Sequence, residues 1–405
     1  MPSTLPDGDP VPPDGSLPDQ AYRAAADRTL SFYVHVPFCA TRCGYCDFNT
    51  YTAGELGTAA SPQSWLDSAL AEIDLAAKVL GNNRTVSTIF VGGGTPSLVG
   101  AEPLTRILGA IDERFGLAAD AEVSTEANPE STDPALLTGL RQAGFTRLSL
   151  GMQSTSRRVL AILDRTHTPG RALDVVAWAR AAGFEHLNLD LIYGTPGETD
   201  DEFAASLRAV VGSGVDHVSA YSLIVEPGTR LARQVDRGML PMPDDDVLAD
   251  RYLLAEELLA AAGFGWYEVS NWARAGAARC RHNLAYWTGQ DWWGIGPGAH
   301  SHVGGVRWWN VKHPAAYAQR LAAGVSPGQA REVLTGEQRT AEDVLLRLRL
   351  DSGVALDRLP ATGRAKAADA ARRGLLDPAA LTAGTARLTL DGRLLADGIA
   401  LDLLG

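Results

Sequence analysis

The segment SFYVHVPFCATRCGYC, residues 31–46, decides the fold, because an apolar run leads directly into three closely spaced cysteines. Residues 31–38 carry the β-branched and aromatic side chains that are typical of a buried strand. Cys39, Cys43 and Cys46 follow in a C-x3-C-x2-C spacing. An iron–sulfur cube is normally held by four thiolates, so three thiolates from one loop predict a [4Fe–4S] cluster with one iron open to a small molecule.

A structural zinc site and a disulfide framework both fit these cysteines less well. Structural zinc sites usually gather four ligands, often as pairs of cysteines, and the sequence contains no second pair. The only other cysteine, Cys280, lies more than two hundred residues away beside a different motif. Three cysteines in one short segment are also too few for a disulfide framework in a chain of this size.

The composition is that of an ordinary globular protein, with 45% hydrophobic and 21% charged residues in 405. A net charge of −12 argues against nucleic acid as a partner, because phosphate contacts need clustered Lys and Arg. No apolar run approaches the roughly 20 residues of a transmembrane helix, and residues 1–20 lack the basic and apolar regions of a signal peptide. We therefore expect a cytoplasmic protein with no transmembrane segment.

Short apolar segments alternate with longer helical patterns over residues 31–224. Strands are expected at 31–38, 87–91, 122–127, 147–153, 186–194 and 217–224, and helices at 64–79, 104–114, 134–142 and 170–182. This alternation predicts a parallel sheet with crossover helices. Six units are too few for a closed eight-stranded barrel, so we expect an α/β fold of the open, partial (β/α)6 TIM-like type.

Polar or flexible residues stand at the ends of these expected strands. A glycine run ending in a threonine, residues 92–95, follows the second strand, while Glu126 and Gln153 close the third and fourth. In parallel α/β folds the chemistry collects at the carboxyl ends of the strands. Glu126 and Asp190 suit ribose hydroxyls or an ammonium group, and Arg165 suits a carboxylate. Each residue alone is equally well explained by a turn or a salt bridge at the rim.

Together these motifs resemble the radical S-adenosylmethionine (SAM) superfamily, and within it the oxygen-independent coproporphyrinogen III oxidase group. The matching segments cover roughly residues 30–310: YVHVPFC at 33–39, GGGTPS at 92–97, STEANPE at 124–130, LSLGMQS at 148–154, LDRTH at 163–167 and NLDLIYGTPGE at 188–198. The resemblance implies that the open iron binds the amino and carboxylate groups of SAM, and that an electron from the cluster splits the C–S bond.

Carried over position by position, the resemblance also implies which residues contact SAM. Tyr33 would line the SAM side of the first strand, and Tyr45 would pack near the adenine. The methionine end and the ribose would be held by residues from four further motifs: Gly93, Gly94, Thr95, Glu126, Gln153, Arg165 and Asp190.

The sequence differs from the oxidases in two places, and both differences are shared by a sister family, the heme chaperones called HemW. The oxidases have a further cysteine two positions after the third, where this chain has Phe48, and their longer N-terminal segment has no evident counterpart here. The run RHNLAYW, residues 281–287, matches the H-N-x-x-Y-W heme-binding motif of that family, and YEVSN at 267–271 and GIGPGAHS at 294–301 also look like it. The resemblance implies that heme is bound as well, with His282 as its ligand.

The region around His282 is rich in aromatic residues, with seven of the nine tryptophans between 266 and 309. Such rings suit a large flat ligand, and imidazole is a common axial ligand of heme iron. The tryptophans are also typical of a buried core or a domain interface. His300, His302 and Cys280 are less favoured ligands, and the sequence has no C-x-x-C-H motif for covalent attachment.

The sequence divides into four predicted regions. Residues 1–28, rich in Pro and Asp, are expected to be disordered; residues 29–265 form the barrel, 266–311 the aromatic heme-binding region, and 312–405 a small helical, winged-helix-like domain. In the last region Asp391 and Gly392 predict a turn between two short strands.

These features favour a heme chaperone that binds a [4Fe–4S] cluster, SAM and heme, and delivers heme to an acceptor such as a membrane respiratory protein. The alternative is a coproporphyrinogen III dehydrogenase acting through a 5′-deoxyadenosyl radical. A radical enzyme with an unrelated substrate is the third hypothesis, against which Phe48 and the aromatic region argue.

Overall fold

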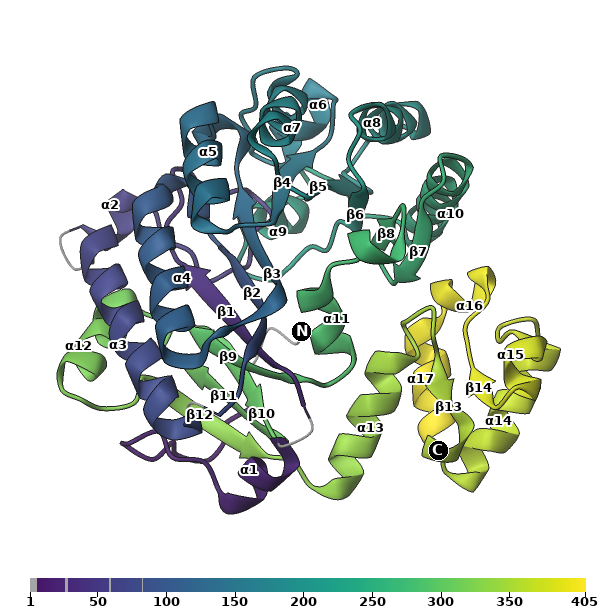
Figure 1. Cartoon of the computed structure of the whole chain (residues 1–405). Helices are drawn as coiled ribbons and strands as arrows, with labels where there is room; N and C mark the ends of the chain where they lie inside the picture. The colour runs from purple at the N-terminus through teal and green to yellow at the C-terminus, as the bar shows by residue number, and fades with distance from the viewer. Residues whose placement is uncertain (1–5, 26–27, 58–59, 82) are drawn as a thin grey trace.

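The computed structural model describes residues 6–25, 28–57, 60–81 and 83–405. Within these residues one twelve-stranded sheet dominates the fold, in the order β12-β11-β10-β9-β1-β2-β3-β4-β5-β6-β8-β7. Figure 1 shows this sheet with α3, α4 and α5 packed along its outside and a separate group of helices, α13–α17, beside it.

The centre of the sheet is the partial barrel that the sequence predicts. Its six parallel strands are β1 (Leu30–Val36), β2 (Val86–Gly93), β3 (Leu117–Ala127), β4 (Arg147–Gln153), β5 (His186–Tyr193) and β6 (His217–Ser222). The crossover helices include α3 (Pro62–Leu80), α4 (Ala101–Phe115), α5 (Pro134–Ala143), α7 (Arg171–Ala182) and α8 (Asp200–Gly212). The predicted fold class, an open (β/α)6 barrel, is confirmed.

Both edges of the barrel carry further strands. On the β1 side, β9 (Asp291–Ile295) pairs with β1 in parallel. Each further strand then pairs antiparallel with the one before it, in the order β10 (His300–Val303), β11 (Val306–Asn310) and β12 (Gly328–Val333). On the β6 side lie β8 (Asn271–Ala273) and β7 (Gly265–Glu268). The aromatic region is therefore part of the barrel sheet, and β12, which we expected in the C-terminal domain, belongs to this sheet too.

The N-terminal segment differs from the prediction of disorder. Asp9 and Arg331 exchange two backbone hydrogen bonds of 2.7 and 2.8 Å, and Ser326 N donates to Pro13 O at 2.7 Å. Further along, α1 (Asp19–Ala25) buries two alanines. The edge strand β12 presents unpaired backbone groups, and the extended N-terminal chain pairs with them. The prediction is wrong for residues 6–25, while residues 1–5 and 26–27 lie outside the described residues.

The C-terminal unit has a hydrophobic core of its own, formed by residues from Val344 to Leu403. It consists of α13 (Gly336–Arg347), β13 (Val354–Ala355), α14 (Ala361–Arg372), α15 (Pro378–Thr382), β14 (Thr385–Ala386), α16 (Leu390–Leu394) and α17 (Ala396–Leu404). The predicted turn at Asp391 and Gly392 is wrong, because both residues lie in α16. The hydroxyl of Thr389 caps this helix by accepting from Gly392 N at 3.1 Å, which favours helix over turn at this point.

A buried carboxyl joins the barrel to its added strands. Glu72 of α3 is fully buried, and its carboxylate oxygens accept from Tyr317 OH at 2.5 Å, Gly296 N at 2.8 Å and Asn310 Nδ2 at 2.8 Å. Burial raises the pKa of Glu72 to about 7, although these donors act to lower it. Glu72 is therefore protonated in the folded protein at a pH where an exposed glutamate is charged.

This raised pKa predicts a loss of stability with rising pH. Between pH 4.5 and about 7 the unfolded chain releases the Glu72 proton while the folded chain keeps it, so the free energy of unfolding falls as pH rises through this window. At roughly 1.4 kcal/mol per pKa unit, Glu72 should lower the free energy of unfolding of the wild type by about 1–3 kcal/mol between pH 5 and pH 8. We expect this part of the fall to be absent in Glu72→Gln. Urea unfolding of both proteins at both pH values measures it; identical pH dependence would contradict the prediction.

Candidate cofactor site

The three cysteines lie in a loop at the carboxyl end of β1. The loop is closed by backbone hydrogen bonds from Cys39 N to Tyr51 O at 3.0 Å and from Tyr51 N to Pro37 O at 2.7 Å. Gly44 fastens it to the barrel, donating to Leu163 O at 3.1 Å and accepting from Leu231 N at 2.8 Å. A side chain at Gly44 would collide with Asp164, which explains the glycine between two cysteines.

The donor set fits an iron–sulfur cluster. All three thiols are unpaired and partly exposed, and Thr95 Oγ1 donates to Cys39 Sγ at 3.8 Å. Burial raises the pKa of Cys46 to about 11, and the neighbouring thiols Cys43 and Cys39 add to this shift. Among the described residues no three His, Cys, Asp or Glu side chains converge on one point. A cube does not require such convergence, because each thiolate binds its own iron.

The glycine run after β2 lies against this loop. Gly94 N donates to Val36 O at 2.7 Å and Thr95 N to Phe38 O at 2.8 Å. Gly93 has a left-handed φ of 111°, and a side chain at Gly94 would overlap the backbone of Val36 and Phe38. The run is therefore required for two strand ends to approach each other beside the cysteines.

Two of the predicted polar residues meet at the end of β4. A Cβ built on Gly151 would lie 2.9 Å from both Arg165 Nη2 and Gln153 Nε2, so these two side chains share one side of the strand. Gln153 adopts a left-handed φ of 66°, which is strained for a residue other than glycine. The Nε atom of Arg165 is buried and has no hydrogen-bond partner in the described part of the chain. An unpaired guanidinium N–H at this place is what a carboxylate ligand would satisfy.

Tyr45 lies in the cysteine loop, close to Arg165. Its ring packs against a small apolar cluster that includes Leu163, Ile192 and Leu223. Burial raises the pKa of its hydroxyl, and the charge of Arg165 opposes this rise. Tyr45 thus places an aromatic ring of the cysteine loop near the guanidinium of Arg165.

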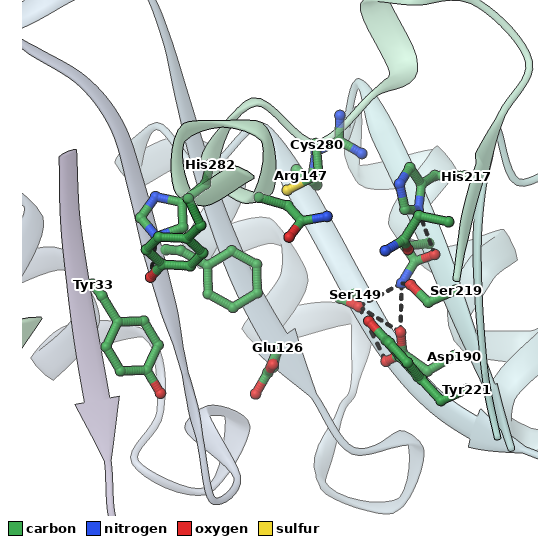
Figure 2. Close-up of a pocket in the computed structure, with 15 residues that line it drawn as sticks. Tyr33, Glu126, Arg147, Ser149, Asp190, His217, Ser219, Tyr221, Cys280 and His282 are labelled. Carbon is green, nitrogen blue, oxygen red and sulfur yellow. Dashed lines mark hydrogen bonds between the residues drawn. The ribbon is translucent and has the colours of Figure 1, made fainter. Parts of the chain in front are cut away.

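A cavity of about 150 Å³ lies inside the barrel below this rim (Figure 2). Three predicted SAM residues, Tyr33, Glu126 and Asp190, line it together with His282. Its lining residues do not include the three loop cysteines, the glycine run, Tyr45, Gln153 or Arg165. The predicted site is therefore split between an outer rim and an inner cavity.

Glu126 stands in the middle of the cavity, between Tyr33 and the group around Asp190 (Figure 2). Its Oε2 accepts from Gly93 N at 2.9 Å, which ties the cavity to the glycine run. Burial, followed by the nearby charge of Asp190, raises the pKa of Glu126 to about 7. Two buried carboxyls that repel each other favour a positively charged or proton-donating ligand.

Asp190 is fixed by its neighbours on the cavity wall. Its oxygens accept from Asn188 Nδ2 at 2.7 Å and Ser149 Oγ at 3.1 Å, and Asn188 Oδ1 contacts His217 Nδ1 at 2.7 Å. Burial nevertheless raises the pKa of Asp190. The sequence interpretation missed all three neighbours.

These neighbours could have been identified from polar residues that recur at every second position along the strands. Polar side chains occupy every second position of three successive strands: Arg147 and Ser149, Asn188 and Asp190, and His217, Ser219 and Tyr221. Alternate residues of a strand face the same side, so these polar residues line the barrel interior instead of the apolar ones expected of a packed barrel.

The RHNLAYW run forms α11 (Arg281–Trp287), which closes one side of the cavity. Its first turn is held by a buried ion pair: Arg147 Nε donates to Glu122 Oε2 at 3.0 Å, and Glu122 Oε1 accepts from His282 N at 3.0 Å. Arg147 also donates to the carbonyl of Ala278 at 2.9 Å. The barrel itself thus supplies the cap that the sequence of α11 lacks.

His282 is enclosed on all sides in this structure. It is 1% exposed, its ring stacks on Phe90 with centroids 5.4 Å apart, and burial lowers its pKa to about 4. Nδ1 lies 2.8 Å from Thr88 Oγ1 and Nε2 lies 2.8 Å from Tyr286 OH. Both ring nitrogens therefore have partners, and the imidazole is neutral at pH 7.

Most of the aromatic region is core. Trp272, Trp293, Trp308 and Trp309 are buried, and Trp293 packs edge-on against Trp308 with centroids 4.8 Å apart. Trp292 is only partly buried and contacts the ring of Tyr286 at 4.6 Å. Interior packing, the alternative to a ligand site, therefore accounts for these four buried tryptophans.

Cys280 lies apart from the other cysteines, on the wall of the inner cavity. It is buried, its Sγ is 3.6 Å from Glu122 Oε1, and burial raises the pKa of the thiol to about 12. This thiol, on the cavity wall and in contact with Glu122, does not belong to the loop that offers the other three. We expect Cys280→Ala to retain the full iron and sulfide content of anaerobically reconstituted protein; loss of even one iron per chain in chemical assays would contradict this.

Comparison with known proteins agrees with this geometry. Residues 33–210 match the model of the radical SAM superfamily. In structure, the chain matches a coproporphyrinogen III oxidase (HemN) from Escherichia coli, described as a radical SAM enzyme, with a TM-score of 0.81 and 25% sequence identity over 98% of this chain and 96% of that one. The fold is that of a radical SAM protein.

Proteins of similar sequence identify the family within the radical SAM superfamily. The heme chaperone HemW of Mycobacterium tuberculosis (strain H37Rv) is 57% identical over 92% of this chain and 94% of its own length. The heme chaperone HemW of Escherichia coli (strain K12) is 37% identical over 72% of this chain and 76% of its own length. The chain belongs to the HemW family of heme chaperones. None of the helices in the described residues is long and apolar enough to span a bilayer.

Proposed function

We propose that this protein is a cytoplasmic heme chaperone that holds a [4Fe–4S] cluster and SAM, binds heme, and transfers the heme to an acceptor, such as a respiratory protein of the membrane. The observation that carries the proposal is the pairing of three unpaired thiols and an unpaired, buried Arg165 N–H at the rim with two buried carboxyls that line the inner cavity. The similarity to HemW proteins supports the heme part of the proposal.

Cys39, Cys43 and Cys46 would hold the cluster, which when bound supplies an electron and one open iron for the amino and carboxylate groups of SAM. Arg165, whose Nε lacks a partner among the described residues, would bind the carboxylate. Glu126 and Asp190, buried near each other, would accept from the ammonium group and the ribose hydroxyls. Gly93, Gly94 and Thr95 leave room for the methionine end, Gln153 adds an amide, and Tyr33 and Tyr45 supply rings.

His282 would bind heme through Nε2, but only after two changes. The hydroxyl of Tyr286 occupies the Nε2 position at 2.8 Å, so this hydrogen bond has to break. The cavity of about 150 Å³ is also smaller than the roughly 300–1,000 Å³ typical of drug-sized ligand sites. Heme therefore requires the cavity to widen on the side of Tyr286, at Nε2, while the opposite nitrogen Nδ1 keeps its contact with Thr88.

The second candidate function is coproporphyrinogen III oxidation, which the likeness to the E. coli oxidase favours. Phe48 argues against it: this side chain is 61% exposed at the position where those oxidases carry another cysteine. Incubation of reconstituted protein with SAM, a reductant and coproporphyrinogen III under anaerobic conditions distinguishes the two. We expect no protoporphyrinogen beyond background, and multiple turnovers would overturn the chaperone assignment.

Heme delivery is tested with membranes from heme-depleted cells. Protein loaded anaerobically with heme is added to the membranes, and recovery of cytochrome activity is compared with that produced by the same concentration of free hemin. We expect faster recovery with the loaded protein. Equal recovery with free hemin would contradict the proposed transfer.

A further inference from the structure

Thr88 lies in none of the motifs that identify the family, yet it contacts His282 directly. It is a residue of β2, 3% exposed, and its side chain points into the barrel toward α11. Thr88 Oγ1 lies 2.8 Å from His282 Nδ1, and Thr88 donates to Ser31 Oγ at 2.8 Å. Ser31 is itself fully buried in β1. The three side chains form a continuous chain of hydrogen bonds across two barrel strands.

The direction of these hydrogen bonds follows from counting protons. A threonine hydroxyl has one proton, and that of Thr88 is given to Ser31. Its oxygen can then only accept from His282, so the proton of the ring sits on Nδ1. A neutral imidazole has a single N–H, which leaves Nε2 with a free lone pair that accepts from Tyr286 OH. Phe90, stacked on the ring at an interplanar angle of 27°, keeps the imidazole in this plane.

We propose that Thr88, oriented by Ser31, is a positioning residue that fixes His282 in the Nδ1–H tautomer, so that Nε2 is the nitrogen that binds heme iron. This inference rests on the proposed heme role of His282. Histidines that bind metals commonly donate their second N–H to a fixed acceptor, and loss of that acceptor typically lowers metal affinity 10–100-fold. Here the acceptor is in place before heme arrives.

The tautomer can be measured without heme. In nitrogen-15 NMR of the full chain labelled at histidine, the His282 signals are assigned by their loss in His282→Gln. We expect the pattern of an Nδ1–H, Nε2-unprotonated ring in the wild type. We expect Ser31→Ala to populate the other tautomer, because the Thr88 proton is then free to turn toward Nδ1. An Nε2–H pattern in the wild type would overturn the inference, whatever heme does.

Heme titration tests the consequence. Thr88→Val keeps the shape of the side chain but removes the acceptor, and we expect its dissociation constant for hemin to rise 10–100-fold, while Thr88→Ser stays within about threefold of the wild type. Thr132→Val is the matched control: Thr132 is also buried and hydrogen-bonded, but its partner is Asn128 O at 2.8 Å and not His282. Its affinity should be unchanged.

The outcomes separate the two claims. If His282→Ala loses heme but Thr88→Val binds it as the wild type does, the positioning role of Thr88 is wrong and the heme role of His282 stands. If His282→Ala binds heme normally, the proposed ligand is wrong, and the role of Thr88 toward heme falls with it even where NMR shows the Nδ1–H tautomer.

Discussion

Replacing Cys43 with alanine is expected to abolish the cluster. The wild-type protein, reconstituted without oxygen, should contain about four irons and four sulfides per chain. The loop offers only three thiolates, and Cys280 is buried elsewhere, on the wall of the inner cavity. Two thiolates do not hold a cube, so iron and sulfide in the variant should fall close to zero. Chemical assays of both, after removal of unbound metal, measure the effect.

A matched loop variant shows whether this loss is specific. Phe48→Ala changes an exposed side chain of the same loop and leaves the three cysteines in place, so it should keep a full cluster. Thermal unfolding of Cys43→Ala without iron should match that of the wild type without iron, because Cys43 is only partly buried. A normal iron content in Cys43→Ala would refute the proposed ligands.

Heme binding should respond in opposite directions to two changes in α11. His282→Ala removes the proposed iron ligand and should abolish saturable binding of hemin, seen as loss of the shift in the Soret band. Tyr286→Phe removes the hydroxyl that competes for Nε2. A hydrogen bond contributes about 1 kcal/mol, so heme should bind roughly five- to tenfold more tightly.

His282→Gln controls for the space that alanine leaves in a buried site, and circular dichroism establishes that each variant is folded. Weaker heme binding by Tyr286→Phe would show that this hydroxyl assists heme instead of competing with it. Unchanged binding by His282→Ala would move the heme site away from α11.

Much of the barrel could be predicted because its strands are short apolar runs between glycine-terminated helices. For example, β4 was expected at residues 147–153 and is found there. The pairing of residues far apart could not be predicted in the same way. The apolar pattern of β9 shows that it is buried, but not that it lies beside β1, and nothing in residues 9–13 indicates that β12 leaves an edge open to them.

The parts of the site that could be predicted from the sequence are those where the function requires an unusual residue spacing or backbone conformation. The cysteine loop and the glycine run are visible because they break the pattern of ordinary strands and turns. The cavity wall was missed because Ser149, Asn188 and His217 are common residue types, whose shared orientation follows only from the register of the strands. Aromatic content was a poor guide near His282, since tryptophan packs a core as readily as it binds a ligand.

The central claim is that three thiolates leave one iron open and that SAM binds to this iron. Electron paramagnetic resonance of the reduced, reconstituted protein, recorded with and without SAM, tests this claim most directly. We predict the signal of a reduced [4Fe–4S] cluster whose g-values shift when SAM is added, and a much smaller shift in Arg165→Ala. A cluster signal that SAM leaves unchanged, or protein that takes up zinc and no iron, would contradict the account.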